Sequence, residues 1–405
     1  MICEISPSIA NGKVFAPPSK SMAHRYLICA SLSEGESVVK GISLSKDISA
    51  TINCLKNLGA NIRLENDVAF IKGISFNHFT ETPILNCNES GSTIRFLIPI
   101  SLLFGERVQL VGAPSLLARP MDVFKNLSVE HQFFFQQNNS EINVCGPLKS
   151  GTYNISGNIS SQFITGLLFA LPLLKEDSVI NIIPPIESYS YLKLTLKALK
   201  DFGIEIIEKD FSFYIKGNQK YSSAVCTVEG DYSNAAFLDV FNFIDGNVEV
   251  LGLDNFSLQG DRVYKKLFPL LDKENQTIDI SDCPDLGPIL FALASIKNGA
   301  TFTGTKRLRI KESDRALTMA EELLKFGVEI KVLENMVIIP KSEIKIPQKA
   351  LNGHNDHRIV MALSILLSKT GGEIFGCEAV SKSYPNFFET IKDLGIGVKI
   401  IETNN

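Results

Sequence analysis

The chain has 405 residues, of which 45% are hydrophobic and 21% are charged, and its formal net charge at pH 7 is -4. These values exclude a disordered chain and predict a globular protein of two or three packed domains. The small negative charge argues against nucleic-acid binding as a main task, because proteins that bind nucleic acids carry a basic surplus that neutralises phosphates.

Two other classes are not indicated. The sequence shows neither a secretory leader nor an uninterrupted apolar run of the roughly 18 residues that a membrane helix needs, so we expect a cytoplasmic protein with no membrane partner. The eight cysteines include no Cys-x-x-Cys pair, so they predict reduced, mostly buried thiols rather than a zinc ribbon or a disulfide framework.

Six short polar clusters each precede a strongly apolar stretch of helical length. Ser, Asp and Asn at such positions accept hydrogen bonds from the free amides of a helix's first turn, so each cluster predicts a helix start. The stretches that follow, such as residues 96–104, 163–174 and 359–367, are apolar on nearly all sides, as in buried helices. In chain order the clusters are Ser19-Lys20-Ser21, Ser90-Gly91-Ser92-Thr93, Ser160-Ser161-Gln162, Asp231-Tyr232-Ser233-Asn234, Asp282-Cys283-Pro284-Asp285 and Asn355-Asp356-His357-Arg358.

A second feature recurs along the chain: an amphipathic helix that ends at Gly and passes into a strand. Gly59, Gly203, Gly327 and Gly395 stand where a left-handed residue would terminate the helix, a conformation that glycine adopts without strain. In a third copy Ser128 takes this place, and the copy around residues 263–272 has lost the pattern.

Runs rich in Val and Ile between the helices predict strands, as at residues 108–112, 178–184 and 337–340. The clusters recur roughly every 70 residues, with one interval of about 50, which indicates six copies of one mixed α/β unit. Three copies on each side of a break near Val228 predict two similar lobes with a cleft between them. Buried helices with ordinary caps also recur by chance, and the regular spacing argues against that interpretation.

Basic residues accompany two of the predicted helix starts. Helix amino ends carry a partial positive charge, so several that face one cleft would bind an anion. Lys20, Ser21 and Arg25 lie at the start of the first helix, and Arg358 lies in the first turn of the sixth. A single Lys or Arg at a helix start is usually a solvated surface charge, but the repetition favours a ligand.

Residues 307–315 form a densely charged segment. A charged loop with helical ion pairs explains this segment as well as a catalytic site does. In a catalytic interpretation, Lys311 would donate a proton beside Glu312, and Arg315 would hold an anion.

Two further groups have competing interpretations. Asp282 and Asp285 flank Pro284 before an apolar helix, where a carboxylate would cap the helix or act as a base for a substrate hydroxyl. His354 and His357 have the spacing of a metal-binding pair, but no third ligand stands near them in the sequence, so we expect no metal site.

Nine ordered motifs are distributed along nearly the whole chain: PPSKSMAHR, ESGSTIRF, LLARPMD, ISSQFITGLL, VEGDYSNAAF, PDLGP, RLRIKESDR, NDHRIVMA and SKSYPNFFE. With these motifs the chain resembles the 3-phosphoshikimate 1-carboxyvinyltransferase family, also called the EPSP synthase family. The resemblance implies an α/β (α+β) fold of two lobes, each made of three βαβαββ units around buried helices, an arrangement described as an inverse α/β barrel. One lobe would comprise residues 15–228 and the other residues 1–14 and 229–405, with the active site in the cleft between them.

The resemblance also implies a reaction. The enolpyruvyl group of phosphoenolpyruvate would be transferred to the 5-hydroxyl of shikimate 3-phosphate with release of phosphate, on the route to chorismate and the aromatic amino acids. Addition would be followed by elimination through a tetrahedral intermediate, without metal or organic cofactor. The family precedent further implies a monomer whose partners are small molecules, and inhibition by glyphosate, for which Gly91 rather than Ala would leave room.

The resemblance assigns site residues one by one. Asp285 would accept the proton of the attacking hydroxyl, Lys311 and Glu312 would handle the proton added to and removed from the methylene carbon, and His357 would lie beside them. Clustered arginines would lower the pKa of Lys311 so that it can donate at neutral pH. The shikimate 3-phosphate site would comprise Lys20, Ser21, Arg25, Ser160, Ser161, Gln162, Ser188, Tyr191, Asp285 and Lys311. The phosphoenolpyruvate site would comprise Lys20, Gly91, Arg119, Gln162, Arg315, Arg358 and Lys382.

Glu89, Ser92 and Arg307 depart from residues that are common in the family, so we leave them outside the predicted site. Two alternatives remain. The first is the sister family that acts on UDP-N-acetylglucosamine, whose reactive cysteine is absent from residues 112–120 here. The second is a binding protein that has lost catalysis, against which the joint presence of the predicted catalytic residues argues.

Overall fold

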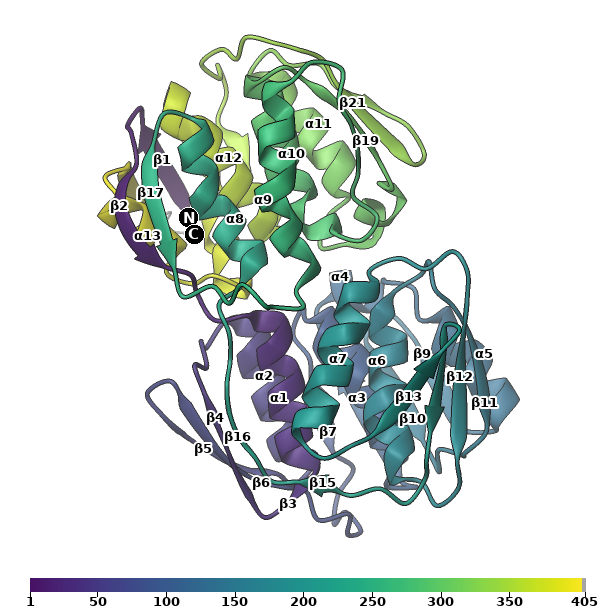
Figure 1. The fold of residues 1–405 in the computed structure, drawn as a ribbon. Helices are drawn as coiled ribbons and strands as arrows, with labels where there is room; N and C mark the ends of the chain where they lie inside the picture. Colours follow the sequence, from purple (N-terminus) through teal and green to yellow (C-terminus); the bar gives the residue numbers. More distant parts are fainter. Residues whose placement is uncertain (403–405) are drawn as a thin grey trace. The chain divides into compact units, whose positions relative to one another are not determined.

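The computed structural model describes residues 1–402. Two compact units divide them: unit 1 contains Met1–Pro17 and the chain from Gly230 onward, and unit 2 contains Pro18–Glu229 (Figure 1). Each unit has a hydrophobic core of its own. The sequence analysis placed the divisions after residues 14 and 228, close to these positions.

The helices and strands of unit 2 follow the predicted alternation. Its helices are α1 (Lys20–Leu32), α2 (Lys46–Asn57), α3 (Gly91–Leu102), α4 (Pro114–Leu117), α5 (Asp122–His131), α6 (Ser161–Ala170) and α7 (Tyr189–Asp201). Its strands are β3 (Ser33–Glu34), β4 (Glu36–Lys40), β5 (Asn61–Glu65), β6 (Val68–Lys72), β7 (Ile84–Asn86), β8 (Arg107–Val111), β9 (Phe134–Gln137), β10 (Glu141–Cys145), β11 (Thr152–Ser156), β12 (Ser178–Ile183), β13 (Ile206–Lys209), β14 (Ser212–Ile215), β15 (Tyr221–Ser222) and β16 (Val225–Thr227).

Unit 1 is built in the same way from the two ends of the chain. Its helices are α8 (Tyr232–Asp239), α9 (Tyr264–Leu267), α10 (Gly287–Ile296), α11 (Arg315–Lys325), α12 (His357–Thr370) and α13 (Phe387–Asp393). Its strands are β1 (Ile2–Ser6), β2 (Asn11–Phe15), β17 (Asn247–Leu251), β18 (Thr277–Asp279), β19 (Ala300–Thr303), β20 (Lys331–Val332), β21 (Met336–Ile339), β22 (Leu351–Asn352), β23 (Gly372–Phe375) and β24 (Gly397–Ile401).

Five four-stranded sheets share one pairing pattern, a parallel pair of strands followed by two antiparallel strands. Their orders are β16-β4-β6-β5, β7-β8-β10-β9 and β11-β12-β14-β13 in unit 2, and β18-β19-β21-β20 and β22-β23-β1-β24 in unit 1. The sixth copy keeps only the parallel pair β2 and β17. This repetition confirms the predicted mixed α/β unit, although none of the sheets in residues 1–402 closes into a barrel.

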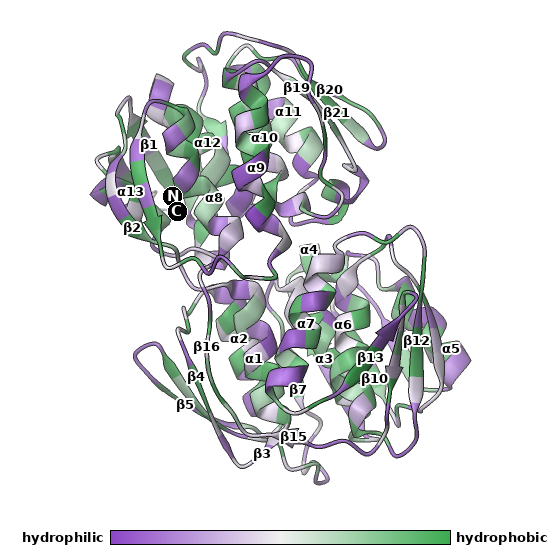
Figure 2. Ribbon diagram, viewed as in Figure 1, coloured by the Kyte–Doolittle hydropathy of each residue, from purple (hydrophilic) through white to green (hydrophobic). Residues whose placement is uncertain are grey.

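One nearly fully buried helix from each copy lies in the core of its unit. These helices are α1, α3 and α6 in unit 2 and α8, α10 and α12 in unit 1, and α6 and α10 are largely green in Figure 2. Close packing of α3 against α6 requires Gly166, because a Cβ there would lie 2.5 Å from the backbone oxygen of Arg95. The removal of each leucine side chain in these helices from water contributes about 2 kcal/mol.

Most of the predicted helix ends are confirmed. The side chains of Ser19, Ser90, Ser160, Asp231 and Asp356 cap α1, α3, α6, α8 and α12. The glycines Gly59, Gly203, Gly327 and Gly395 all have positive φ.

Two of these predictions are wrong. The Asp282–Asp285 cluster leads into a short 3-10 helix (η5, Pro284–Leu286), and α10 then begins after Leu286 without a side-chain cap. Pro284 and Pro288 have no amide hydrogen, so fewer free amides need a cap there. Ser128 does not end its helix, since α5 continues to His131 and Gln132 takes the left-handed conformation with φ 56°.

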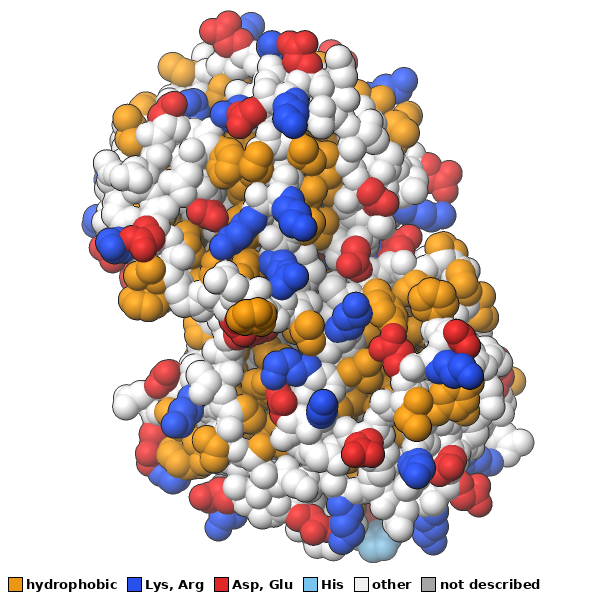
Figure 3. All heavy atoms as spheres, in the orientation of Figure 1, with side chains coloured by type: hydrophobic (Ala, Val, Ile, Leu, Met, Phe, Trp, Pro, Cys, Tyr) orange, Lys and Arg blue, Asp and Glu red, His pale blue; other side chains and the backbone are white. Residues whose placement is uncertain are grey.

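On the face shown in Figure 3, Lys and Arg side chains are interspersed with Asp and Glu side chains. All eight cysteines are free, and six of them are buried, which confirms the predicted thiols. A membrane-spanning helix would have to be longer and more apolar than any helix in residues 1–402.

Candidate functional site

In unit 2, cationic groups surround the amino end of α3. A Cβ placed on Gly91 would lie 2.9 Å from Nη1 of Arg119 and 3.5 Å from Nη1 of Arg95. Arg95 Nη1 donates to Oε1 of Gln162 over 2.7 Å, and Gln162 Nε2 donates to Oγ of Ser92 over 2.9 Å. Two guanidinium groups, an amide and a helix amino end therefore face the bare backbone of Gly91, an arrangement that suits an anion.

A second group in unit 2 joins α1 to α7. The buried Arg25 donates from Nε to Thr195 Oγ1 over 3.0 Å and from Nη2 to the backbone oxygen of Tyr191 over 3.0 Å. Lys20, the first residue of α1, forms an ion pair with Asp47 over 2.9 Å. Arg25 thus fixes the position of α7 relative to α1, while the Lys20 ammonium stays partly exposed.

Unit 1 gathers its charged groups around the start of α11. Asp285 Oδ1 accepts from Lys311 Nζ over 3.0 Å and from Arg315 Nη1 over 2.7 Å. Arg315 also contacts Glu312, from Nη2 to Oε2 over 2.7 Å, and Asp356, from Nε to Oδ2 over 2.9 Å. The Arg315 side chain is only 1% exposed, so three carboxylates hold this buried cation in place.

Arg358 differs from Arg315, because its donors are not all used. It lies in the first turn of α12, is 4% exposed and stacks over the Phe237 ring at 5.5 Å from the centroid. Its Nε and Nη1 atoms have no hydrogen-bond partner within residues 1–402. Burying an ionised donor without a partner is costly, so this geometry favours an anionic ligand at Arg358.

The surroundings shift the pKa values of two groups in the Asp285 cluster. Burial alone would raise the pKa of Asp285, but Lys311, Arg315 and Arg358 hold it well below the ordinary value of 3.8. Burial, aided by Arg315 and Arg307, lowers the pKa of Lys311 despite the opposing charge of Asp285. Arginines were expected to cause the shift in Lys311, and burial is the larger cause.

A fourth acid, Asp261, is almost fully buried close to this cluster. Ser233, in the first turn of α8, donates a hydrogen bond to Asp261 Oδ2. Burial and the charge of Asp285 raise the pKa of Asp261 to about 7, although Ser233 and Arg358 oppose the shift. Asp261 therefore titrates near neutral pH.

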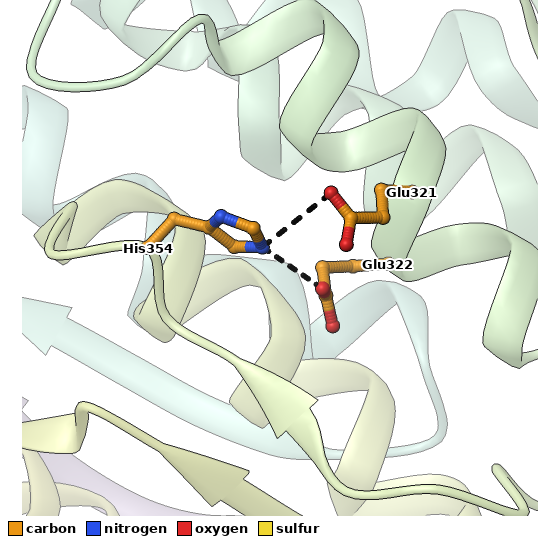
Figure 4. Close-up of side chains that lie close together, drawn as sticks. All are labelled: Glu321, Glu322 and His354. Carbon is orange, nitrogen blue, oxygen red and sulfur yellow. Dashed lines mark hydrogen bonds and ion pairs between the residues drawn. The ribbon is translucent and has the colours of Figure 1, made fainter.

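His354 contacts carboxylates rather than completing a pair of metal ligands with His357. Its Nε2 atom lies 2.9 Å from Glu322 Oε1 and 3.9 Å from Glu321 Oε2 (Figure 4). These three residues could hold an ion by their spacing. Lys325 Nζ, however, donates to both oxygens of the buried Glu322 over 2.9 Å, so an ammonium already neutralises that carboxylate.

Residues 6–391 match the family of EPSP synthase, or 3-phosphoshikimate 1-carboxyvinyltransferase. The chain belongs to this family. A 3-phosphoshikimate 1-carboxyvinyltransferase of Clostridium perfringens is 41% identical over 414 aligned positions, which cover 96% of this chain and 97% of that relative. Its counterpart in Clostridium acetobutylicum is 43% identical, with 97% of each chain covered.

Solved structures show the same fold. An EPSP synthase structure from Acinetobacter baumannii has a TM-score of 0.79 with 21% identity and covers 98% of this chain and 100% of its own. A second EPSP synthase structure from that organism has a TM-score of 0.80 with 20% identity and covers 99% of this chain and 100% of its own. These similarities confirm the predicted fold class of the EPSP synthase family.

The predicted EPSP synthase site residues fall into clusters within each unit. In unit 2, Gly91, Arg119 and Gln162 lie together, and Arg25 joins Ser21 to Tyr191. Ser160 and Ser161 open α6, and Ser188 precedes α7 with φ 55°. In unit 1, Asp285, Lys311, Glu312 and Arg315 form one network. His357 and Arg358 follow Asp356, and Lys382 Nζ donates to the backbone oxygen of Asn355.

Sequence reasoning missed two residues of these clusters. Arg95 lies one turn after Gly91 on α3, and a charge inside an otherwise apolar helix was the available signal. Asp356 was interpreted only as a helix cap, yet its fully buried carboxylate also binds Arg315 and accepts from Ser313 Oγ over 3.1 Å. The NDHR motif gives no indication that Asp356 binds Arg315, which lies 41 residues earlier in the chain.

Proposed function

We propose that this protein transfers the enolpyruvyl group of phosphoenolpyruvate to the 5-hydroxyl of shikimate 3-phosphate and releases phosphate. Membership of the EPSP synthase family supports the reaction. The observation that carries the proposal is Arg358, a buried guanidinium with two unused donor atoms beside the Asp285 cluster. A small, multiply charged anion such as phosphoenolpyruvate would satisfy those donors.

The proposed phosphoenolpyruvate site draws on both units. Its residues are Lys20, Gly91, Arg119 and Gln162 of unit 2 and Arg315, Arg358 and Lys382 of unit 1. Arginine forks bind carboxylate and phosphate oxygens in pairs, and the unshielded backbone of Gly91 admits a ligand closely. Arg95 also belongs to this proposed site. Its Nη1 atom donates to Gln162 and, like Nη1 of Arg119, lies close to the Cβ position of Gly91.

Shikimate 3-phosphate offers a phosphate, a carboxylate and hydroxyls, which need a mixture of cationic and polar partners. We assign it to Lys20, Ser21, Arg25, Ser160, Ser161, Gln162, Ser188, Tyr191, Asp285 and Lys311. Arg25 has three of its donors committed within unit 2, so we expect it to contribute mainly charge and to hold Tyr191 in position.

Asp285 is a weak base in this arrangement, because Lys311 and Arg315 share its Oδ1 atom. Substrate anions that bind these two cations would draw their charge from Asp285 and raise its basicity. Asp285 then accepts the proton of the 5-hydroxyl while that oxygen bonds to C2 of phosphoenolpyruvate. Substrate binding therefore switches on the base.

Proton transfer at the methylene carbon falls to Lys311 and Glu312. Lys311 has a lowered pKa, so its ammonium can give a proton to C3 as the C2–O bond forms. The product of addition is a tetrahedral intermediate with a methyl group. Elimination removes a proton from this methyl, breaks the C2–O bond to phosphate and restores the double bond. His357, whose Nδ1 atom lies 3.9 Å from Asp356 Oδ1, would lie beside these groups.

The family resemblance also implies a monomer that works in the cytoplasm, and we propose both. Sedimentation of the purified protein would test the first, and fractionation of the source cells would test the second.

Solvent deuterium tests the reaction and its course together. The purified protein would be incubated with phosphoenolpyruvate and shikimate 3-phosphate in D2O, and the product examined by proton and phosphorus NMR. We expect 5-enolpyruvylshikimate 3-phosphate with deuterium in its vinyl group, because addition protonates C3 from exchangeable groups. Product without deuterium would refute addition and elimination, and absence of product would refute the proposed function.

A further inference from the structure

Four buried polar side chains form a continuous chain from α1 to the amino end of α3 in unit 2. His24 Nδ1 lies 2.8 Å from Thr51 Oγ1 on α2, and Thr51 Oγ1 lies 2.7 Å from Thr93 Oγ1 on α3. Thr93 Oγ1 in turn donates to Oγ of Ser90, the cap of α3, over 2.7 Å. None of the four residues is more than 1% exposed, and we call them the hydroxyl chain.

The direction of these hydrogen bonds follows from the number of protons. A hydroxyl has one proton to donate, and that of Thr93 goes to Ser90. Thr51 must therefore donate to Thr93, and His24 must donate from Nδ1 to Thr51. A single arrangement of protons satisfies all three contacts.

This arrangement requires a neutral histidine. His24 Nε2 is buried and has no partner among the described residues, so a proton on that atom would be left without an acceptor. Burial lowers the pKa of His24 well below 6.5, and the positive charges of Lys20 and Arg25 lower it further. The hydroxyl chain thus keeps one direction at physiological pH.

The last member of the chain controls the geometry of the helix start. Ser90 Oγ accepts from the Thr93 amide over 3.2 Å as well as from its hydroxyl, so both of its lone pairs are used and its rotamer is fixed. The next two residues are Gly91, which faces Arg119, and Ser92, which accepts from Gln162. Any shift of the cap would move these two residues relative to the arginines.

We propose that the hydroxyl chain is a positioning device that holds the amino end of α3 in register for phosphoenolpyruvate. The inference rests on the proposed function, and it adds His24, Thr51, Thr93 and Ser90 as positioning residues that do not touch substrate. Their contribution should fall mainly on phosphoenolpyruvate. Gln162, which donates to Ser92, is shared by both proposed sites, but the second cluster of unit 2, around Arg25, does not depend on Ser90.

Matched substitutions at Thr51 test the proposal. Thr51→Val keeps the shape of the side chain but removes the oxygen that accepts from His24, whereas Thr51→Ser keeps the oxygen. We expect Thr51→Val to raise the KM for phosphoenolpyruvate about 5-fold, with kcat and the KM for shikimate 3-phosphate within about twofold of the wild type. Thr51→Ser should restore the wild-type KM. Ser101→Ala, which removes another buried hydroxyl of α3, should leave all three constants unchanged.

Several results would overturn the proposal: an unchanged KM for phosphoenolpyruvate in Thr51→Val, equal increases for both substrates, or a Thr51→Ser variant that behaves like Thr51→Val. If Thr51→Val does not fold, the Thr93→Val and Thr93→Ser pair is judged by the same criteria. Failure of both Val variants to fold would also count against it, because the chain would then serve the fold alone.

The wild type is measured first, so the two levels of inference can be separated. A wild type without turnover would refute the proposed function, and the hydroxyl chain would then be judged by calorimetric binding of phosphoenolpyruvate to the same variants. If the wild type is active and the Thr51 variants have the same KM for phosphoenolpyruvate as the wild type, only the proposed role of the hydroxyl chain is refuted.

Discussion

Arg315 and Asp285 lie 2.7 Å apart between Nη1 and Oδ1, and the same carboxylate oxygen lies 3.0 Å from Lys311 Nζ. One carboxylate thus holds two of the cations that we assign to the substrates. Lys311 and Arg315 hold the pKa of Asp285 low, and the substrates would compete with it for these two cations. This relationship links substrate binding to the activation of the base.

Lys311 is expected to be indispensable for proton transfer. Lys311→Gln should lower kcat by about 100-fold or more, because a positioned acid contributes roughly that factor. The measurement is steady-state phosphate release with both substrates saturating. Lys306→Gln is the matched control, since this lysine is 66% exposed and pairs with Glu334 on the surface. Full turnover in Lys311→Gln would eliminate the proposed role.

Gly91→Ala should weaken phosphoenolpyruvate binding through Arg119. The new Cβ would lie 2.9 Å from Arg119 Nη1, and the end of that flexible side chain would move while the fold survives. We expect the KM for phosphoenolpyruvate to rise about 10-fold with little change for shikimate 3-phosphate, which corresponds to roughly 1.4 kcal/mol. A double-mutant cycle with Arg119→Lys tests whether Gly91→Ala acts by displacing Arg119. Fully additive effects of the two substitutions on the KM for phosphoenolpyruvate would show that Arg119 is not involved.

Asp261 predicts a pH dependence of stability. Its pKa is raised from 3.8 to about 7 in the folded protein, so the folded state binds an extra proton between these values. The resulting stabilisation is present below about pH 4 and is lost as the pH rises through 7. In Asp261→Asn, which mimics the protonated acid, the free energy of unfolding should fall less steeply between pH 4 and 7. Urea unfolding at several pH values measures this difference, and parallel curves for the two proteins would contradict it.

The group of Glu321, Glu322 and His354 should not depend on a metal. The Lys325 ammonium already neutralises Glu322, so we expect a chelator to leave turnover and thermal stability unchanged. Glu322→Gln should instead lower the free energy of unfolding by about 2 kcal/mol, because it leaves Lys325 without its partner. Glu321→Gln, at a side chain that is 63% exposed, is the control. A chelator that lowers stability would identify a bound ion.

Features governed by neighbouring residues could be predicted from the sequence. A serine or aspartate that caps a helix and a glycine that ends one act over three or four residues, so most of the helix boundaries were correct. The prediction at Ser128 was wrong because α5 continues for three more residues to His131. The left-handed residue that ends the helix is Gln132. The prediction for the Asp282–Asp285 cluster was wrong because a 3-10 helix that begins at Pro284 precedes α10.

Contacts between distant residues could not be predicted from local pattern. Asp356 binds Arg315 across 41 positions, and Arg95 meets Gln162 across 67. Neither pair has a periodicity that a single sequence displays. The placement of β1 between β23 and β24 likewise depends on the whole fold. The family resemblance implied only that residues 1–14 join the second lobe.

The central claim is the choice of acceptor, and phosphate release from phosphoenolpyruvate tests it most directly. Purified protein would be given phosphoenolpyruvate with either shikimate 3-phosphate or UDP-N-acetylglucosamine, and free phosphate would be followed over time. We predict release with shikimate 3-phosphate alone. Release with the sugar nucleotide alone, or with neither acceptor, would contradict the account.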